Sequence, residues 1–153
     1  MFLFKAARAT YLQVIGRKRH AFPYGPQEVR GDELVLLAEN RAGGGTLHKQ
    51  VQYVAKLRRV RPAPPAELDR LFPGENAGQR WRFVVDLYFR RKLTPGFNLH
   101  DVEGFDYRHY RTVQGFSLIR ENDQLAVIKH LIDFYPSLIL ELADRSDDER
   151  DAS

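Results

Sequence analysis

The stretch over residues 80–92 places the strongest constraint on what this chain can fold into. Apolar side chains stand at every second position from Trp81 to Phe89, and a period of two is typical of a β-strand. The intervening positions hold Arg80, Arg82, Val84, Asp86, Tyr88 and Arg90. The pattern predicts one long strand with an aromatic core face and a mostly basic face, on which Asp86 pairs with a neighbouring arginine. Basic groups interleaved with aromatic rings suit a surface that holds a phosphate backbone and stacks a base.

The rest of the chain predicts short strands and helices without regular alternation. Strands are expected at residues 2–7, 34–38, 51–60 and 112–119, and helices at residues 9–15, 66–72, 121–134 and 138–143. We expect a bulge near Arg58, where the apolar phase slips, and a basic loop over residues 17–20. The helix at 121–134 is expected to form one apolar stripe from Leu125, Ile128, Leu131 and Ile132. This order of predicted strands and helices favours an α+β fold: a curved β-sheet or pseudo-barrel of about five to six strands flanked by short helices, with a C-terminal helix.

Charge is unevenly divided along the 153 residues. The net charge is +4, but residues 141–153 hold six acidic and two basic side chains, so the other 140 residues carry +8. Clustered positive charge attracts polyanions such as nucleic acid, although a basic total also serves solubility. We expect one domain over residues 1–144 and an acidic, disordered tail over residues 145–153. No apolar run reaches the ~18 residues of a membrane span and no signal peptide is evident, so a cytoplasmic location without membrane contact is expected.

Basic side chains recur at the ends of the predicted strands and in the loops between them. Two positively charged segments close or flank strands, at residues 56–61 and 80–92, and two others lie in loops, at residues 17–19 and 108–111. If those strands are neighbours, their roughly fourteen charges merge into one field. Arginine and lysine also protect sheet edges from unwanted pairing, and this alternative accounts for some of them.

Residues suited to catalysis or metal binding form no recognisable constellation. The chain has no cysteine, and His100 and His109 are the only plausible metal cluster, although metal ligands usually share one rigid element. No serine lies in a nucleophile elbow, and the glycine loop at residues 43–45 lacks the Lys-Ser/Thr ending of a phosphate-binding loop. We therefore expect a protein that is not an enzyme, with no catalytic residue, metal or cofactor.

Taken in order, several segments resemble the EVE domain family, within the wider PUA-like group. The first strand is apolar and ends in Lys5, and a Gly-Asp turn leads to an apolar strand that ends in Asn40. A Val-x-Tyr-Val-Ala-x-Leu strand follows, and the long strand leads to a Lys-Leu-Thr-Pro bend. The match spans roughly residues 2–132 and closes with Gln114 and Gly115 before a helix with an acidic cap.

The resemblance implies a curved sheet or pseudo-barrel with helices around it. It also implies a reader that takes one flipped base of a nucleic acid, DNA or RNA, into an aromatic pocket, especially a modified base such as methylated cytosine. Flipping a base costs roughly a few kcal/mol, which stacking and hydrogen bonds to the base edge offset. Because such domains often accompany restriction or other defence functions, a nuclease or defence protein is an expected partner.

Carried over to this chain, the resemblance assigns contacts with the base edge to Asn40, Gln114 and Gly115. The family commonly has a tryptophan soon after the first strand, but the only tryptophan here is Trp81. The aromatic wall of the pocket is instead expected from Tyr11, Phe22 and Tyr24. Contacts with backbone phosphates are expected from Arg17, Lys18, Arg19, Arg58, Arg59 and Arg111. Two alternatives stand beside this interpretation: an RNA-binding PUA-like module for structured RNA, and a protein-interaction subunit whose basic surface docks an acidic partner.

Overall fold

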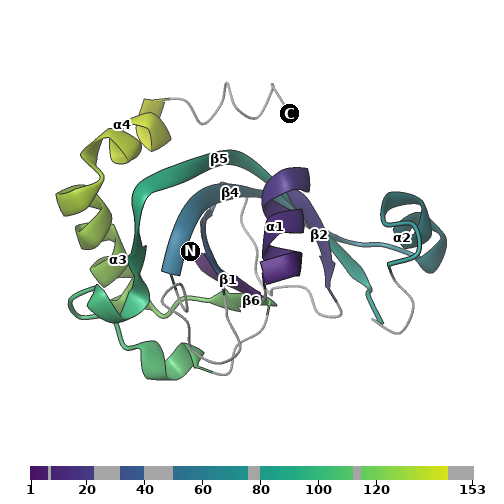
Figure 1. The fold of residues 1–153 in the computed structure, drawn as a ribbon, viewed down its shortest axis with the longest axis horizontal. Coiled ribbons are helices and arrows are strands. Elements are labelled where there is room, and N and C mark those ends of the chain that lie inside the picture. The colour runs from purple at the N-terminus through teal and green to yellow at the C-terminus, as the bar shows by residue number, and fades with distance from the viewer. Residues whose placement is uncertain (7, 23–31, 40–49, 76–79, 112–114, 145–153) are drawn as a thin grey trace.

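The computed structural model describes residues 1–6, 8–22, 32–39, 50–75, 80–111 and 115–144. It shows a strongly curled sheet with helices on both sides (Figure 1). The strands are β1 (Phe2–Ala6), β2 (Arg19–Phe22), β3 (Leu34–Glu39), β4 (Gln50–Pro62), β5 (Phe83–Asn98) and β6 (Gly115–Leu118). The helices are α1 (Arg8–Arg17), α2 (Pro65–Leu71), α3 (Glu121–Phe134) and α4 (Pro136–Asp144), with short 3-10 turns η1 (Leu99–Asp101) and η2 (Tyr107–Tyr110).

One six-stranded sheet runs through the described residues in the order β2-β5-β4-β3-β1-β6. β1 lies parallel to β3, and the other neighbouring pairs are antiparallel. The pairing of β4 with β5 shifts register beside Arg58 and again beside Phe89. Such bulges bend a strand and increase its twist, so these long strands curl around the core. The predicted α+β fold with a curved sheet of about six strands is confirmed, as is the bulge near Arg58.

The middle of β5 is buried on both faces, so the predicted exposed basic face is wrong there. Every residue from Val84 to Phe89 is at most 5% exposed. Leu87 packs in the apolar cluster beneath α1, whereas Tyr88 and Phe89 both pack in the cluster that includes α3. Two successive side chains share one cluster because Phe89 has a positive φ of 50°, which interrupts the alternation of the strand. The strand begins at Phe83, so Arg80 and Trp81 precede it.

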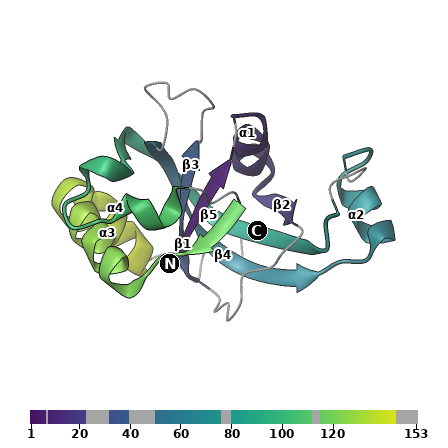
Figure 2. The ribbon, with the colours of Figure 1, turned by 90° about the horizontal axis from the view of Figure 1, so that it is seen from below.

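Apolar clusters cover the two faces of the curled sheet. On one face, α1 contributes Val14 and Ile15 to a cluster with Phe2 and Phe4 of β1. On the other, α3 and α4 pack against residues of β3, β4 and β5. A smaller cluster joins α2 to the far end of the long strands, and Figure 2 shows α2 at the opposite end of the molecule from α3 and α4.

α3 turns a different face to the core from the one its apolar pattern predicts. Three members of the expected stripe are between 41% and 62% exposed, namely Leu125, Ile128 and Ile132. The buried face carries Asp123, Val127 and Leu131. Asp123 is tolerated there because its carboxylate accepts a hydrogen bond of 2.7 Å from the Tyr110 hydroxyl. A hydrogen-bonded carboxylate thus anchors the helix on a face that periodicity alone assigns to solvent.

The basic loop predicted over residues 17–20 is also wrong. Arg19 and His20 belong to β2, which pairs antiparallel with β5 and places Ala21 opposite Val84. This four-residue strand has too little apolar pattern to be recognised, and pairing with β5 decides its conformation. The expected tail at 145–153 and the glycine loop at 43–45 lie outside the described residues. Within the described part of the chain, no helix has the length and apolar character needed to cross a bilayer.

Candidate nucleic-acid interface

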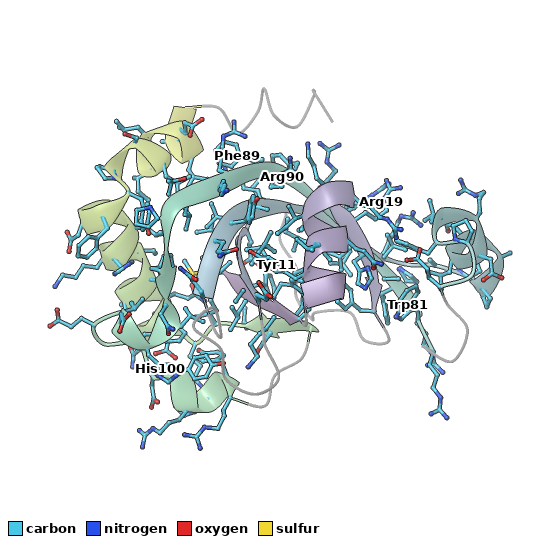
Figure 3. The ribbon with its side chains drawn as sticks, in the orientation of Figure 1. Tyr11, Arg19, Trp81, Phe89, Arg90 and His100 are labelled. Atoms are coloured by element: carbon cyan, nitrogen blue, oxygen red, sulfur yellow. The ribbon has the colours of Figure 1, made fainter. Side chains whose placement is uncertain are left out.

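Five cationic side chains from two distant segments line one hollow of about 490 Å³. We call it the basic hollow; its lining residues are Gly16, Arg17, Lys18, Arg19, Arg58, Arg59, Asp86 and Leu87. It lies where α1 ends, β2 begins and β4 bulges, and Figure 3 shows Arg19 beside the end of α1. The structure therefore brings together all but one of the six residues that the sequence predicts for phosphate contacts.

The end of α1 is fixed by backbone hydrogen bonds that hold Lys18 at the hollow. The Lys18 N–H donates to the Val14 carbonyl at 2.9 Å, and the Leu87 N–H donates to the Lys18 carbonyl at 2.8 Å. Lys18 itself has a φ of 55°, a left-handed conformation that usually falls to glycine after a helix. The Arg90 guanidinium also donates to the Ile15 carbonyl. α1 is thus tied to β5 on both sides of its last turn.

Asp86 organises two of the cations. Its carboxylate is 4% exposed and accepts hydrogen bonds from Arg19 Nε at 2.5 Å and Arg59 Nε at 2.9 Å. Burial works against ionisation of this carboxyl, but the hydrogen bonds and charges of Arg59 and Arg19 outweigh it and hold its pKa below the usual range. Asp86 therefore stays charged and fixes both guanidinium groups, which confirms the predicted pairing with a neighbouring arginine.

The basic hollow is lined by more cations than carboxylates. Its lining holds five cations and one carboxylate, and Glu75 offsets a further charge by pairing with Arg17 at 2.9 Å. Cationic side chains therefore outnumber carboxylates around the hollow. Arg58 lies over the Tyr88 ring with its guanidinium carbon 5.3 Å from the ring centre, a contact that helps to position this side chain. Cations clustered in one concavity attract a polyanion such as a phosphate backbone.

A second hollow, of about 300 Å³, lies along α1 from the basic hollow and contains two tyrosines. We call it the tyrosine hollow; it is lined by Tyr11, Leu12, Gln52, Tyr53, Lys92, Leu93, Thr94, Pro95 and Gly96. The Tyr11 and Tyr53 rings lie 6.4 Å apart with an angle of 64° between their planes. Tyr11 is 1% exposed, whereas Tyr53 is only partly buried and presents more of its ring. In Figure 3, Tyr11 lies on the side of α1 that faces the inside of the curled sheet.

Gly96 keeps the wall of the tyrosine hollow close to β4. A Cβ atom at this position would lie 2.5 Å from the Val51 carbonyl oxygen, a distance that real Cβ atoms essentially never show. The sequence gives Tyr53 no functional role, because this residue takes its place in the apolar alternation of the 51–60 strand. Val51 stands two positions before Tyr53, and a Pro-Gly bend faces the Tyr53 ring. Neither adds a signal beyond that alternation.

Solved structures of an ASCH protein from Zymomonas mobilis are similar to this fold, and three of them each cover 84% of this chain. A single-substitution variant has a TM-score of 0.63 at 11% identity over 96% of its own length, and the unmodified protein 0.62 at 11% over 93%. A second variant has a TM-score of 0.60 at 12% identity over 94%. This chain has a PUA-like fold. No family model and no curated protein matches the sequence. The likeness shows the fold, and membership of the EVE family stays a prediction.

The other predicted pocket residues take different places in this PUA-like fold. Phe22 is 8% exposed and packs edge-on against Phe4 and Phe116, with ring centres 5.6 Å and 5.0 Å away. Gly115 stands behind it, because a Cβ atom there would lie 3.4 Å from the Phe22 ring. Both residues thus build the core between β2, β1 and β6 rather than the tyrosine hollow. Tyr24, Asn40 and Gln114 lie outside the described residues.

Arg111 is the predicted phosphate ligand that does not line the basic hollow. It follows η2, and its carbonyl accepts a hydrogen bond of 3.2 Å from the buried Lys5 ammonium. Lys5 also donates to the Tyr107 hydroxyl at 2.8 Å and to the Tyr110 carbonyl at 2.7 Å. These bonds tie η2 to β1 and place the Arg111 backbone there. Among the described residues, no group of three or more histidine, aspartate or glutamate side chains is placed to hold a metal ion.

Proposed function

We propose that this PUA-like protein is a non-enzymatic nucleic-acid-binding module. The basic hollow holds backbone phosphates, and the tyrosine hollow holds one base. The observation that carries the proposal is the convergence of residues 17–19 and 58–59, which lie about forty positions apart, on one cationic concavity. Nucleic-acid binding depends on such clustering, because each phosphate contact releases counterions and contributes affinity.

The relation between the two hollows supports a shared ligand. Tyr11 and Arg17 both belong to α1 and are six residues apart, so the hollows are separated by roughly 9 Å along the helix axis. A short stretch of single-stranded nucleic acid can reach both the basic hollow and the tyrosine hollow. The tyrosine hollow, at about 300 Å³, is at the small end of ligand pockets and suits one planar ring. Tyr53 supplies a stacking face, and Gln52 and Lys92 supply polar groups at the edge.

The proposal extends to the kind of base that the tyrosine hollow binds. The resemblance to the EVE family suggests a modified base such as methylated cytosine, flipped out of its strand. The alternative of an RNA ligand rests on the PUA-like fold itself and predicts a preference for folded RNA. Both alternatives use the same hollows, so one set of binding measurements separates them.

The test is a binding series with fluorescent oligonucleotides of one length. It includes single-stranded and duplex DNA with and without 5-methylcytosine, single-stranded and folded RNA, and polyglutamate as a polyanion without bases. We expect nucleic acid to bind more tightly than polyglutamate and the affinity to fall steeply with salt. Tyr53→Ala should weaken nucleic-acid binding by about 1–3 kcal/mol and leave polyglutamate binding unchanged, because it removes stacking and no charge.

A matched control separates loss of the base contact from general damage. Leu118→Ala removes a 59% exposed apolar side chain that lines neither hollow, and it should leave all affinities unchanged. Equal affinity for polyglutamate and every nucleic acid would refute the proposal and favour docking of an acidic protein partner.

A further inference from the structure

A third hollow, of about 490 Å³, lies between α3 and the bend of β5. We call it the aromatic hollow, because four of its lining residues carry rings: Phe97, His130, Phe134 and Tyr135. The remaining lining residues are Gln50, Pro95, Gly96, Asn98 and Asp101. It shares only Pro95 and Gly96 with the tyrosine hollow and contains none of the cations of the basic hollow.

The rings of the aromatic hollow form one continuous surface. His130 lies 4.6 Å from Phe97 and 4.7 Å from Phe134 between ring centres, with interplanar angles of 50° and 40°. Tyr135 lies 5.9 Å from Phe97, and its hydroxyl donates to the Pro95 carbonyl at 2.5 Å. Phe134 is nevertheless 68% exposed. A large ring left in water beside three others is an unused contact surface, since burying such a side chain is worth roughly 1.5–3 kcal/mol.

The electrostatics of the aromatic hollow are opposite to those of the basic hollow. Asp101 lines it with an exposed carboxylate, and no lysine or arginine does so among the residues that the structure describes. Burial lowers the pKa of His130 despite the nearby charges of Asp133 and Asp101, so the imidazole is neutral at pH 7. Gln50 adds a buried Oε1 atom that accepts no hydrogen bond from any described residue. The hollow thus offers ring faces, one negative charge and an acceptor.

We propose that the aromatic hollow binds an organic cation, a guanidinium or ammonium group, against its rings and beside the Asp101 carboxylate. Ring faces carry partial negative charge and attract cations, most strongly where several rings and a carboxylate meet. The group belongs either to an arginine or lysine side chain of a partner protein or to a free small cation. The inference does not depend on nucleic-acid binding, because neither the four aromatic side chains nor Asp101 lines the basic hollow or the tyrosine hollow.

The test is an NMR titration of the full chain that follows the ring signals of Phe97 and His130. The probes are a capped Gly-Arg-Gly peptide, the same peptide with neutral citrulline in place of arginine, and methylguanidinium chloride. We expect the arginine peptide to shift both ring signals saturably and the citrulline peptide to leave them unmoved. A peptide that binds more tightly than methylguanidinium indicates a partner's side chain, and equal binding indicates a free cation.

Two variants assign the binding to this hollow. Asp101→Asn and Phe134→Ala change exposed side chains, so the fold should survive, and each should weaken the arginine peptide by about threefold or more. Leu140→Ala, which alters a 65% exposed residue outside the hollow, is the matched control and should bind as the parent does. The proposal is overturned if citrulline binds as well as arginine, if adenosine produces the same shifts, or if Asp101→Asn leaves the affinity unchanged.

Discussion

The backbone at Lys18 gives a test that separates folding from binding. Its φ of 55° is a conformation in which a side chain costs roughly 1–2 kcal/mol relative to glycine. Glycine in turn loses roughly 0.4–1 kcal/mol more conformational entropy when the chain folds. The Lys18 side chain is exposed, so its removal sacrifices no buried contact. We therefore expect Lys18→Gly to raise the free energy of unfolding by roughly 0.5–1 kcal/mol.

Lys18→Ala is the control, because it removes the same charge and keeps a side chain in the left-handed conformation. Urea unfolding followed by the fluorescence of Trp81, the only tryptophan, measures both variants. The glycine variant should be more stable than the alanine variant by about the same 0.5–1 kcal/mol, and both should lose equal affinity for an oligonucleotide. An alanine variant as stable as the glycine variant would refute the argument from backbone strain. Unequal losses of affinity would refute the assignment of Lys18 as a simple charge.

Three further predictions concern Asp86, His20 and Gly96. Asp86→Asn should lower the free energy of unfolding by about 1–3 kcal/mol at pH 7, as measured in urea, because two guanidinium groups lose a charged acceptor. The pKa of Asp86 is lower in the folded chain than in the unfolded chain. The stabilisation that this carboxylate contributes is therefore present at neutral pH and is lost as the pH falls through the folded pKa. Burial lowers the pKa of His20 to about 4. The parent should therefore lose up to ~3 kcal/mol of stability between pH 6.5 and pH 4, where the unfolded chain binds the proton and the folded chain does not. His20→Gln should flatten this part of the pH profile of stability, and an unchanged profile would contradict the lowered pKa of His20. Gly96→Ala should destabilise the fold by about 2 kcal/mol in thermal or urea unfolding, because its Cβ meets the Val51 carbonyl. Gly16→Ala, with open space around it on α1, should stabilise the fold by about 0.5–1 kcal/mol. Equal effects of the two substitutions would argue against the close approach at Gly96.

Strands marked by a continuous apolar run or by alternation were predictable, and the misassignments have a common cause. The expected elements at 2–7, 34–38 and 51–60 match β1, β3 and β4 within two or three residues. β2 was missed because its pairing with β5, not its own residues, makes it a strand. Periodicity also cannot reveal that the centre of β5 is covered on both faces, or that a bulge at Phe89 shifts the phase of its side chains.

The site shows the same division between local and non-local information. Residues 17–19 and 58–59 stand out as basic in the sequence, and the fold joins them in the basic hollow. Arg111 is equally basic but follows η2, and no local pattern states which strand a 3-10 turn will face. Phe22 was assigned to the pocket because aromatic residues build such walls, yet its edge-on contacts with Phe4 and Phe116 make it part of the core. Tyr53 belongs to the apolar alternation of its strand and packs against the core, and the same side chain lines the tyrosine hollow.

Whether the basic hollow binds backbone phosphates can be measured from the salt dependence of oligonucleotide binding. The parent chain is compared with a Lys18→Ala/Arg58→Ala double variant, in which two cations of the basic hollow are removed, and with Arg70→Ala/Arg108→Ala, in which two exposed arginines outside it are removed. Each phosphate contact contributes about 0.7 to the slope of log affinity against log salt for a single strand. We expect a slope shallower by about 1.4 for the first variant and the parental slope for the second. Parallel lines for the parent and the Lys18→Ala/Arg58→Ala variant would contradict it.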